Sequence, residues 1–426
     1  MKVLVIGSGG REHAIAWKVS QSPLLRKLYA APGNAGIEEI AECHPIKADD
    51  IEGLCHFAKT RSIDLTIVGP EAPLVAGIVD RFQKEGLPIF GPSQQAAMLE
   101  GSKAFAKEKM SRFGIPTADY QIFSHMNEAK QYVIEAEMPI VIKADGLAAG
   151  KGVVICENSK EAVTAITQMM GEGVFGNAGK QIVVEQLLRG EEISILAICD
   201  GEKMIPLASA QDHKRAYDHD RGPNTGGMGA YSPCPQIPDS LVEESVRVSI
   251  LPMLQGMARE GMPYRGILYA GLMLTKEGPY VLEYNCRMGD PETEAILPRL
   301  RSDLLQAMAE VAAGHLTTTQ LTWDERACMT VVIASGGYPG HFEKGYEVQG
   351  LEALKGRDDL MVFHAGTGRR TDGRVVTQGG RVFAVSALGK SLKTASELVY
   401  QEIDKINFQE KFFRRDIGRR ALEVYR

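Results

Sequence analysis

The stretch YVLEYNCRMGDPE (280–292) carries the side chains with the clearest chemistry. Glu283, Asn285 and Arg287 alternate along one predicted strand, so their side chains point to the same face. Two neighbouring oxygen ligands suit Mg²⁺, which takes few protein ligands and completes its shell with phosphate oxygens and water. The arginine places a cation beside that metal site. The alternative interpretation is a half-exposed sheet face with a solvated carboxylate.

A glycine-rich stretch, VIKADGLAAGKGVVI (141–155), indicates phosphate binding. Its spacing is not that of a Walker A loop, because no G-K-[S/T] follows four free positions. A glycine-rich β-hairpin also folds over phosphates, using backbone N–H donors and a nearby lysine. The alternative is a flexible hairpin with surface lysines. That alternative is weaker because Lys143 lies inside an apolar strand, where an unpaired charge is costly.

The first predicted strand runs into the turn GSGGREH (7–13), which matches half of a dinucleotide-binding fingerprint. The third glycine position holds Glu12, and the second strand ends in Ala30 and Ala31 where an acidic residue is required. We therefore expect neither nicotinamide nor flavin binding. A glycine turn at a helix N-terminus with Arg11 beside it remains a small-anion site. The alternative is a tight turn without a ligand.

The segment SAQDHKRAYDHDRGPNTGGMGAYSP (209–233) is a long polar loop rich in Gly, Pro, Asp and basic residues. Loops of this length inside compact domains usually have a function. Met228 and Tyr231 give this loop apolar groups to pack. The sequence therefore predicts a lid or substrate loop rather than disorder.

The elements that position these residues follow from where the strands stop. KVLVIG, KLYAAPG, DLTIVGP and LPIFGP each end in Gly or Pro and are separated by amphipathic segments, a pattern typical of a parallel α/β sheet. Ligands of such sheets bind at the carboxyl ends of the strands. The chain then changes to α+β patterns. The predicted regions are an α/β substrate domain (1–100), a helical connection (101–120), a small lobe with the glycine-rich loop (121–190), a larger lobe with the metal site (191–326) and a β-rich C-terminal domain (327–426).

The composition of the 426-residue chain is that of an ordinary globular protein, with 44% apolar and 24% charged residues. Its formal net charge of −6 argues against nucleic-acid binding, although it is compatible with a local basic pocket for phosphates. The seven cysteines are scattered without metal-binding spacing, which indicates reduced thiols. We find no signal peptide and no run of about 18 apolar residues, so we expect a cytoplasmic protein without a membrane span.

Several stretches in order along the chain carry a resemblance to a known family: GSGGREHA, APGNAG, VGPEAPL, GSKAFAK, KADGLAAGKGV, QDHKR, GPNTGGMGAYSP and NCRMGDPE. Together they resemble the ATP-grasp superfamily and, more narrowly, the phosphoribosylamine–glycine ligase (glycinamide ribonucleotide synthetase) family of purine biosynthesis. The resemblance covers essentially the whole chain. It implies an N-terminal parallel α/β pre-ATP-grasp domain, a two-lobed ATP-grasp clamp and a C-terminal β-rich domain, with ATP between the lobes.

The resemblance also implies a role for each matching position. ATP would contact Lys103, Lys143, Gly146, Gly150, Lys151, Gly152, Glu185, Gln186, Leu188 and Glu191. Glu283 and Asn285 would hold Mg²⁺ or Mn²⁺. Glycine and 5-phosphoribosylamine would be bound by Gly9, Gly10, Arg11, Glu12, Asn34, Glu71, Asp212, Lys214, Asn224, Arg287 and Asp290. The expected catalytic residues are Lys143, Arg287 and Asp212. Charge complementarity and its place in the polar loop make Asp212 the candidate for holding the ammonium group of glycine, and the glycine turn at 9–11 is expected to hold the 5′-phosphate.

The chain departs from the family pattern in a few places. Gly271 stands where many ATP-grasp enzymes carry a further acidic metal ligand, which leaves the number of protein–metal contacts open. Met288 replaces the usual Phe or Leu, an exchange that tolerates differences in volume. The stretch AYDHDRG (216–222) is more basic than usual, and its role stays open. We interpret the basic stretch FFRRDIGRR (412–420) as a solvated end rather than as part of the substrate side.

The implied reaction joins the carboxylate of glycine to the amine of 5-phosphoribosylamine and converts ATP to ADP and phosphate. A carboxylate is a poor acyl donor, so glycyl phosphate would form first, and positioning with neutralisation of phosphate charge would supply most of the catalysis. The partners are small molecules, and we expect a monomer or weak dimer. One alternative is another ATP-grasp enzyme such as a carboxylase, which would share the clamp but lack GPNTGGMGAYSP with NCRMGDPE. The other is a non-catalytic nucleotide-binding regulator, against which the retained lysines, Glu283 and Arg287 argue.

Overall fold

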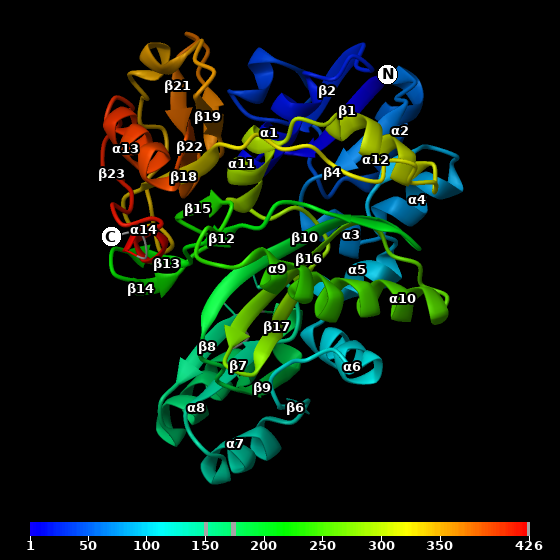
Figure 1. The fold of residues 1–426 in the computed structure, drawn as a ribbon, viewed down its shortest axis with the longest axis vertical. Coiled ribbons are helices and arrows are strands. Elements are labelled where there is room, and N and C mark those ends of the chain that lie inside the picture. Colours follow the sequence, from blue (N-terminus) through cyan, green and yellow to red (C-terminus); the bar gives the residue numbers. More distant parts are fainter. Residues whose placement is uncertain (149–151, 172–175, 424–426) are drawn as a thin grey trace.

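The computed structural model describes residues 1–148, 152–171 and 176–423. Its N-terminal region is a parallel sheet in the order β3-β2-β1-β4-β5, with helices around it (Figure 1). The strands are β1 (Lys2–Gly7), β2 (Lys27–Pro32), β3 (Glu42–Cys43), β4 (Leu65–Val68) and β5 (Ile89–Phe90), and the helices are α1 (Gly10–Val19), α2 (Ile51–Arg61), α3 (Glu71–Val75) and α4 (Ile78–Lys84). The apolar run of β1 is fully buried, as expected for a central strand covered on both faces. The predicted parallel α/β sheet is therefore confirmed.

Two helices lead out of this sheet, α5 (Gln94–Gly101) and α6 (Lys103–Phe113). Ser102 caps α6, because its hydroxyl oxygen accepts a hydrogen bond from the backbone N–H of Phe105 at 3.1 Å. Gly114 ends the helix in the left-handed region at φ 67°, which a residue without a side chain adopts freely.

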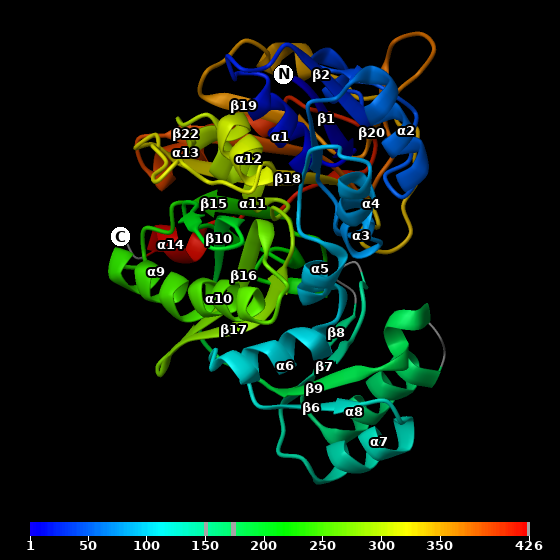
Figure 2. The same ribbon diagram turned by 90° about the vertical axis from the view of Figure 1, so that its right-hand side faces the viewer.

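The small lobe that follows α6 projects away from the rest of the molecule (Figure 2). Its antiparallel sheet has the order β6-β9-β7-β8, and its own core cluster packs between this sheet and two helices. The elements are β6 (Tyr120–Phe123), β7 (Ile140–Ala144), β8 (Val153–Cys156), β9 (Ile182–Gln186), α7 (Met126–Glu135) and α8 (Ser159–Ile166).

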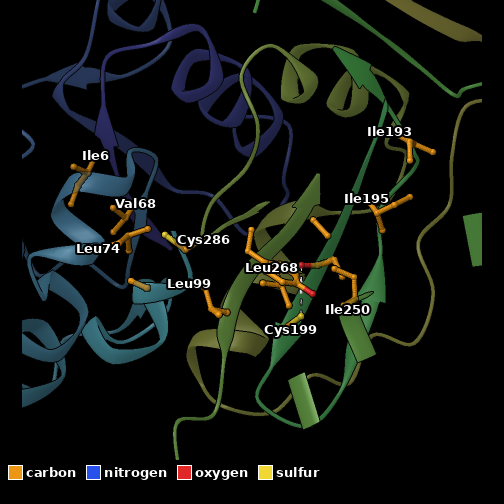
Figure 3. Packing of buried hydrophobic residues seen from close by; sticks show 14 of the residues in the cluster. Ile6, Val68, Leu74, Leu99, Ile193, Ile195, Cys199, Ile250, Leu268 and Cys286 are labelled. Atoms are coloured by element: carbon orange, nitrogen blue, oxygen red, sulfur yellow. Dashed lines mark hydrogen bonds between the residues drawn. The ribbon is translucent and has the colours of Figure 1, made fainter. Parts of the chain in front are cut away.

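A second antiparallel sheet, in the order β11-β10-β16-β17, lies between the small lobe and the N-terminal region (Figures 1 and 2). Its strands are β10 (Glu191–Asp200), β11 (Met204–Pro206), β16 (Arg265–Thr275) and β17 (Gly278–Asn285); the nearby helices are α9 (Asp239–Ser245), α10 (Leu251–Arg259), α11 (Glu292–Ile296) and α12 (Leu304–Ala312). Figure 3 shows Ile6 and Val68 of the N-terminal sheet in one buried cluster with Cys199 and Leu268 of this central sheet. The two regions therefore share a core, which fixes their relative position.

The C-terminal sheet draws strands from two separate parts of the chain. Its order is β12-β15-β18-β22-β19, with β23 also paired to β18. These strands are β12 (Gln211–Asp212), β15 (Gly229–Ser232), β18 (Ala327–Ser335), β19 (Leu360–His364), β22 (Arg381–Gly389) and β23 (Lys411–Phe412), with α13 (Leu392–Ile403) and α14 (Arg419–Glu423). Two hairpins complete the region, β13 (Arg215–Tyr217) with β14 (Arg221–Asn224) and β20 (Thr367–Arg369) with β21 (Val375–Thr377). The polar loop 209–233 is thus joined by both ends to the sheet of the C-terminal region.

The basic stretch 412–420 is not simply a solvated end. The side chain of Arg414 is only 1% exposed, and Ile417 is also buried. That interpretation of the sequence was wrong at these positions because the β13–β14 hairpin binds Arg414, through contacts described below, and the side chain of Ile417 lies against Gly229 of β15. All seven cysteines are free thiols. No helix within the described residues is long and apolar enough to cross a membrane.

Candidate functional site

The glycine turn before α1 is filled by the side chain of Glu12. The backbone N–H of Gly9 donates to Glu12 Oε2 at 2.6 Å, and Arg11 Nε donates to Glu12 Oε1 at 2.6 Å. A Cβ at Gly7, where φ is 124°, would fall 2.5 Å from Glu12 Cγ, and one at Gly69 would fall 2.2 Å from Glu12 Oε1. The buried carboxylate therefore occupies the space that a third glycine would leave for a dinucleotide, which explains physically why the fingerprint is broken.

Arg11 and Arg287 meet at Glu71, the first residue of α3. Arg287 Nε donates to Glu71 Oε2 at 3.2 Å, and Arg11 Nη1 lies 3.9 Å from the same oxygen. Burial alone would raise the pKa of Glu71, but the two guanidinium groups outweigh it and lower this pKa to about 2. Three of the predicted substrate residues, Arg11, Glu71 and Arg287, thus form one charged cluster.

Glu100 of α5 joins the same cluster, although no motif marks it in the sequence. Its Oε1 lies 2.7 Å from Arg287 Nη2, and its Oε2 accepts the backbone N–H of Cys286 at 2.8 Å. Arg287 Nη2 also donates to Asn285 Oδ1 at 3.2 Å. The guanidinium of Arg287 is therefore fixed by two carboxylates and an amide before any ligand arrives.

Asn34 holds the backbone around the turn together. Its Nδ2 donates to the carbonyls of Ser8 and His364, both at 2.8 Å, while its Oδ1 accepts the backbone N–H groups of Gly36 and Ile37 at 3.0 Å. The predicted substrate contact of Asn34 stays a prediction. In the structure its amide atoms bind the protein backbone.

Next to the small lobe, Lys103 lies beside the first residues of the glycine-rich loop, 144–146. Lys103 Nζ donates to the carbonyl of Ala144 at 2.8 Å and to that of Gly146 at 3.1 Å. Asp145 Oδ1 accepts the backbone N–H of Ala104 at 2.7 Å. The N-terminus of α6 is therefore bound directly to the start of the glycine-rich loop, although Ala104 and Asp145 are 41 positions apart in the sequence.

A buried set of two lysines and one glutamate lies beside this unit. Lys143 Nζ is 2.9 Å from Glu185 Oε2 and donates to the carbonyl of Leu282 at 3.0 Å, which joins the small lobe to β17. Lys107 Nζ is 3.3 Å from Glu185 Oε2 and donates to Thr117 Oγ1. Glu185 Oε1 is buried and has no hydrogen-bond partner among the described residues. The sequence did not single out Lys107, because its partner Glu185 belongs to a distant strand.

The remaining predicted ATP contacts lie around this set. Gly152 and Gly146 are closely packed, since a Cβ would fall 2.6 Å from Ala148 Cβ at the first and 2.8 Å from Ala178 Cβ at the second. Gly150 and Lys151 lie outside the described residues. Gln186 is exposed, Leu188 is half-buried, and Glu191 Oε1 accepts hydrogen bonds from Gln236 and Gln211.

Glu283 and Asn285 of β17 lie among basic side chains: Glu283 is near several lysines, and Asn285 accepts a hydrogen bond from Arg287. Burial by itself would raise the pKa of Glu283, but Lys214, Lys143, Lys103 and Arg287 together lower it, so the carboxylate is ionised at neutral pH. Gly271 is the cross-strand partner of Glu283, and a Cβ there would lie 3.4 Å from Glu283 Cγ. Over residues 1–148, 152–171 and 176–423, no group of three or more His, Cys, Asp or Glu side chains is placed to hold a metal ion.

The polar loop supplies a second group of predicted residues. Asp212 pairs with Ala230 in the C-terminal sheet, and Lys214 Nζ lies 2.8 Å from Glu192 Oε2 of the central sheet. The pKa of Asp212 is raised to about 7, mainly by burial, with the charge of Lys214 opposing and those of nearby glutamates adding to the rise. Asn224 stands opposite Arg215 in the β13–β14 hairpin.

Asp290 connects the glycine turn to the C-terminal sheet. Its Oδ2 would lie 3.5 Å from a Cβ on Gly9, and its Oδ1 is 3.0 Å from Nη1 of Arg381, the first residue of β22. The same Nη1 donates to the carbonyls of Gly226 and Asp290 at 2.8 Å. Arg381 was missed in the sequence, where it is one arginine after a glycine pair with no motif around it.

Comparison with known proteins gives matches along nearly the whole chain. Three family profiles of phosphoribosylglycinamide synthetase match it: the N domain over residues 1–100, the ATP-grasp (A) domain over 101–293 and the C domain over 328–420. The phosphoribosylamine–glycine ligase of Halalkalibacterium halodurans is 51% identical over 422 residues, covering 99% of this chain and 97% of the relative. That of Escherichia coli O157:H7 is 50% identical over 426 residues, covering 99% of each.

Solved structures agree with these matches. The crystal structure of phosphoribosylamine–glycine ligase from Thermotoga maritima is similar with a TM-score of 0.84 at 34% identity, covering 98% of this chain and 100% of that one. A biotin carboxylase from Campylobacter jejuni is similar with a TM-score of 0.75 at 15% identity, covering 96% and 92%. The second likeness concerns the fold alone.

Proposed function

The chain belongs to the phosphoribosylglycinamide synthetase family, and we propose that the residues gathered around β17 join glycine to 5-phosphoribosylamine with ATP. The activity is an ATP-dependent ligation of glycine in purine biosynthesis. The products are glycinamide ribonucleotide, ADP and phosphate.

ATP fits between the small lobe and β17. The observation that carries this assignment is the unpartnered Glu185 Oε1, a buried acceptor that the exocyclic amino group of a purine would satisfy. Lys143 beside it and Lys103 at the foot of the glycine-rich loop place two cations where the phosphates would lie. The loop from Gly146 to Gly152 would cover those phosphates, and the strand end at Gln186 and Leu188 with Glu191 would hold the adenosine.

Glu283 and Asn285 would hold the metal. Their donor set of one carboxylate and one amide oxygen suits Mg²⁺ or Mn²⁺, which share hard oxygen ligands and take the rest from phosphates and water. When bound, the metal neutralises charge on the reacting phosphate. Gly271 offers no third ligand from the neighbouring strand, so phosphate and water would fill most of the coordination shell.

The substrate side would be formed by the cluster on Arg287 and by the polar loop. Asp212 would hold the ammonium group of glycine, and Lys214 and Asn224 would line the same part of the substrate site. The positive end of α1, at the turn formed by Gly9, Gly10 and Arg11, would bind the 5′-phosphate of phosphoribosylamine. Glu71 and Asp290 lie beside that turn and would hold the sugar.

The chemistry would proceed through glycyl phosphate. The carboxylate of glycine attacks the γ-phosphorus of ATP and ADP leaves; the sugar amine then attacks the acyl carbon, and phosphate leaves as the nitrogen gives up one proton. Lys103, Lys143 and Arg287 stabilise the negative charge that develops on the transferred phosphoryl group. By covering the phosphates, the glycine-rich loop would exclude water, which would otherwise hydrolyse the acyl phosphate.

The proposal is tested by ADP release with each acceptor in turn. We expect release to require both glycine and 5-phosphoribosylamine, with glycinamide ribonucleotide detected by mass. Release that instead depends on bicarbonate would indicate a carboxylase, and ATP binding without glycine-dependent turnover would indicate a nucleotide-binding regulator.

A further inference from the structure

The two basic stretches that received no role in binding, 216–222 and 412–420, are bound to each other. Phe412 of β23 packs on Tyr217 of β13 with ring centroids 6.0 Å apart. Arg420 Nη2 donates to Asp220 Oδ2 at 2.9 Å, and the backbone N–H of Arg415 donates to Asp218 Oδ1 at 2.8 Å. The C-terminal segment therefore lies along the β13–β14 hairpin of the polar loop.

Arg414 is the centre of this contact and one of the largest fully buried side chains of the protein. Its Nε donates to Asp416 Oδ1 at 2.8 Å, its Nη2 to Asp220 Oδ1 at 3.0 Å and its Nη1 to the carbonyl of Arg215 at 3.1 Å. The planar guanidinium thus bridges the C-terminal segment, the tip of the hairpin and its first strand. A lysine has a single ammonium and cannot bind all three acceptors in this arrangement.

The tip of the hairpin has a backbone conformation that needs such support. His219 and Asp220 have φ values of 63° and 53°, in the left-handed region that residues with side chains rarely adopt. The N–H of His219 donates to Asp416 Oδ2 at 2.8 Å, and Asp220 is held by Arg414. The acceptors and donors that fix these two residues come from the C-terminal segment.

The contact extends to the base of the hairpin, where the predicted substrate residues lie. The backbone N–H of Gly418 donates to His213 Nε2 at 3.1 Å, and His213 stands between Asp212 and Lys214. The carbonyl of Lys214 accepts the N–H of Thr225 at 2.7 Å, which closes the base. A displacement of the C-terminal segment would therefore be transmitted to both Asp212 and Lys214.

We infer that Arg414 is a positioning residue for glycine binding, which acts by fixing the hairpin that carries Asp212 and Lys214 at its base. The inference rests on the proposed function, because it takes this loop as the glycine side of the site. Arg414 itself touches no substrate. Its removal should therefore act on the loop and leave the ATP side, formed by Lys103, Lys143 and Glu185, unchanged.

The test compares Arg414→Gln with Arg415→Gln, a matched neighbour whose side chain is 62% exposed. For Arg414→Gln we expect the KM for glycine to rise by about tenfold or more and the KM for ATP to stay within about twofold, because only the loop loses its support. Amide exchange should rise in 211–229 and stay unchanged in 140–146. Arg414→Lys should recover part of the glycine KM, and Arg415→Gln should match the parent enzyme.

Asp220→Asn provides a second variant in case Arg414→Gln does not fold, since Asp220 lies at the exposed tip and the amide keeps one of the two acceptor oxygens that bind Arg414 and Arg420. We expect a smaller shift of the glycine KM in the same direction. Equal rises of both KM values, or an unchanged glycine KM in both variants, would overturn the inference. A parent enzyme without glycine-dependent ADP release would instead contradict the proposed function, so the two failures are distinguishable.

Discussion

The ATP side and the glycine side of the site are built in different ways. The ATP side takes its charged groups from strands of the small lobe, from α6 and from β17, and its central ion pair, Lys143 with Glu185, is almost fully buried. The glycine side is assembled from the α1 turn, α3, α5, the polar loop and the C-terminal sheet, and several of its charges are partly exposed.

The difference has an energetic consequence. A buried pair such as Lys143 with Glu185 is costly to break, because removal of one partner leaves a charge without compensation. On the glycine side, ion pairs such as Lys214 with Glu192 and Arg381 with Asp290 are more exposed, and the geometry depends on several contacts together. We therefore expect single substitutions on the ATP side to abolish turnover, and those on the glycine side to change substrate affinity.

The largest effect is expected for Lys143→Ala. The loss of a cation at the phosphates should reduce ATP-dependent ligation by at least about 10²- to 10³-fold. Steady-state ADP release measures this, and the thermal midpoint checks that the fold persists. Lys160→Ala, at an exposed position of α8 in the same lobe, is the control and should be active. Turnover near that of the parent enzyme would remove Lys143 from the phosphate site and weaken the contrast between the two sides.

Glu283→Ala should produce the next largest effect, because β17 joins the two sides. The loss of the ionised metal ligand should raise the Mg²⁺ concentration needed for half-maximal activity by roughly 10- to 100-fold. Glu277→Ala, at the exposed β16–β17 turn, is the control. An Mg²⁺ titration that is the same as that of the parent enzyme would mean that Glu283 does not bind the metal.

The contrast between the two sides also explains what could be predicted from the sequence. The parallel sheet, the α/β class and the family were predicted correctly, because strands that end in glycine and motifs in order are local patterns. Glu283 and Asn285 alternate along β17 as expected, whereas Arg287 lies beyond the end of that strand.

Residues whose partners are remote in sequence could not be found in this way. Glu100 meets the N–H of Cys286 across 186 positions, and Arg414 meets Asp220 across 194. Neither lies in a motif, and their neighbours in sequence do not show which groups they will contact. For this reason the C-terminal stretch was interpreted as a solvated end: the β13–β14 hairpin that buries Arg414 lies 194 positions earlier in the sequence.

On the glycine side, Asp212→Asn should raise the KM for glycine by about 30- to 100-fold, the value of a charge-assisted hydrogen bond of roughly 2–3 kcal/mol. The KM for ATP should stay within about twofold. Asp239→Asn, at the exposed start of α9, is the matched control and should leave both values unchanged. A rise in the KM for ATP of the same size would place Asp212 on the ATP side.

The smallest effect concerns pH and His213. Burial, reinforced by the charge of Arg414, lowers the pKa of His213 to about 4, and its neutral ring accepts the N–H of Gly418. In the unfolded chain this histidine takes up a proton near its ordinary pKa of about 6.5, so the stability it contributes is present above that pH and is lost as the pH falls towards 4.

His13 and His364 are also buried with lowered pKa values, so the parent enzyme should lose stability over this range through all three residues. His213→Gln keeps an acceptor but cannot be protonated, and its thermal midpoint should fall less steeply between pH 6.5 and 4.5 than that of the parent enzyme. An equally steep fall in both proteins would show that the Gly418 contact does not depend on the charge of His213, and that acid acts on the molecule elsewhere than at the substrate loop.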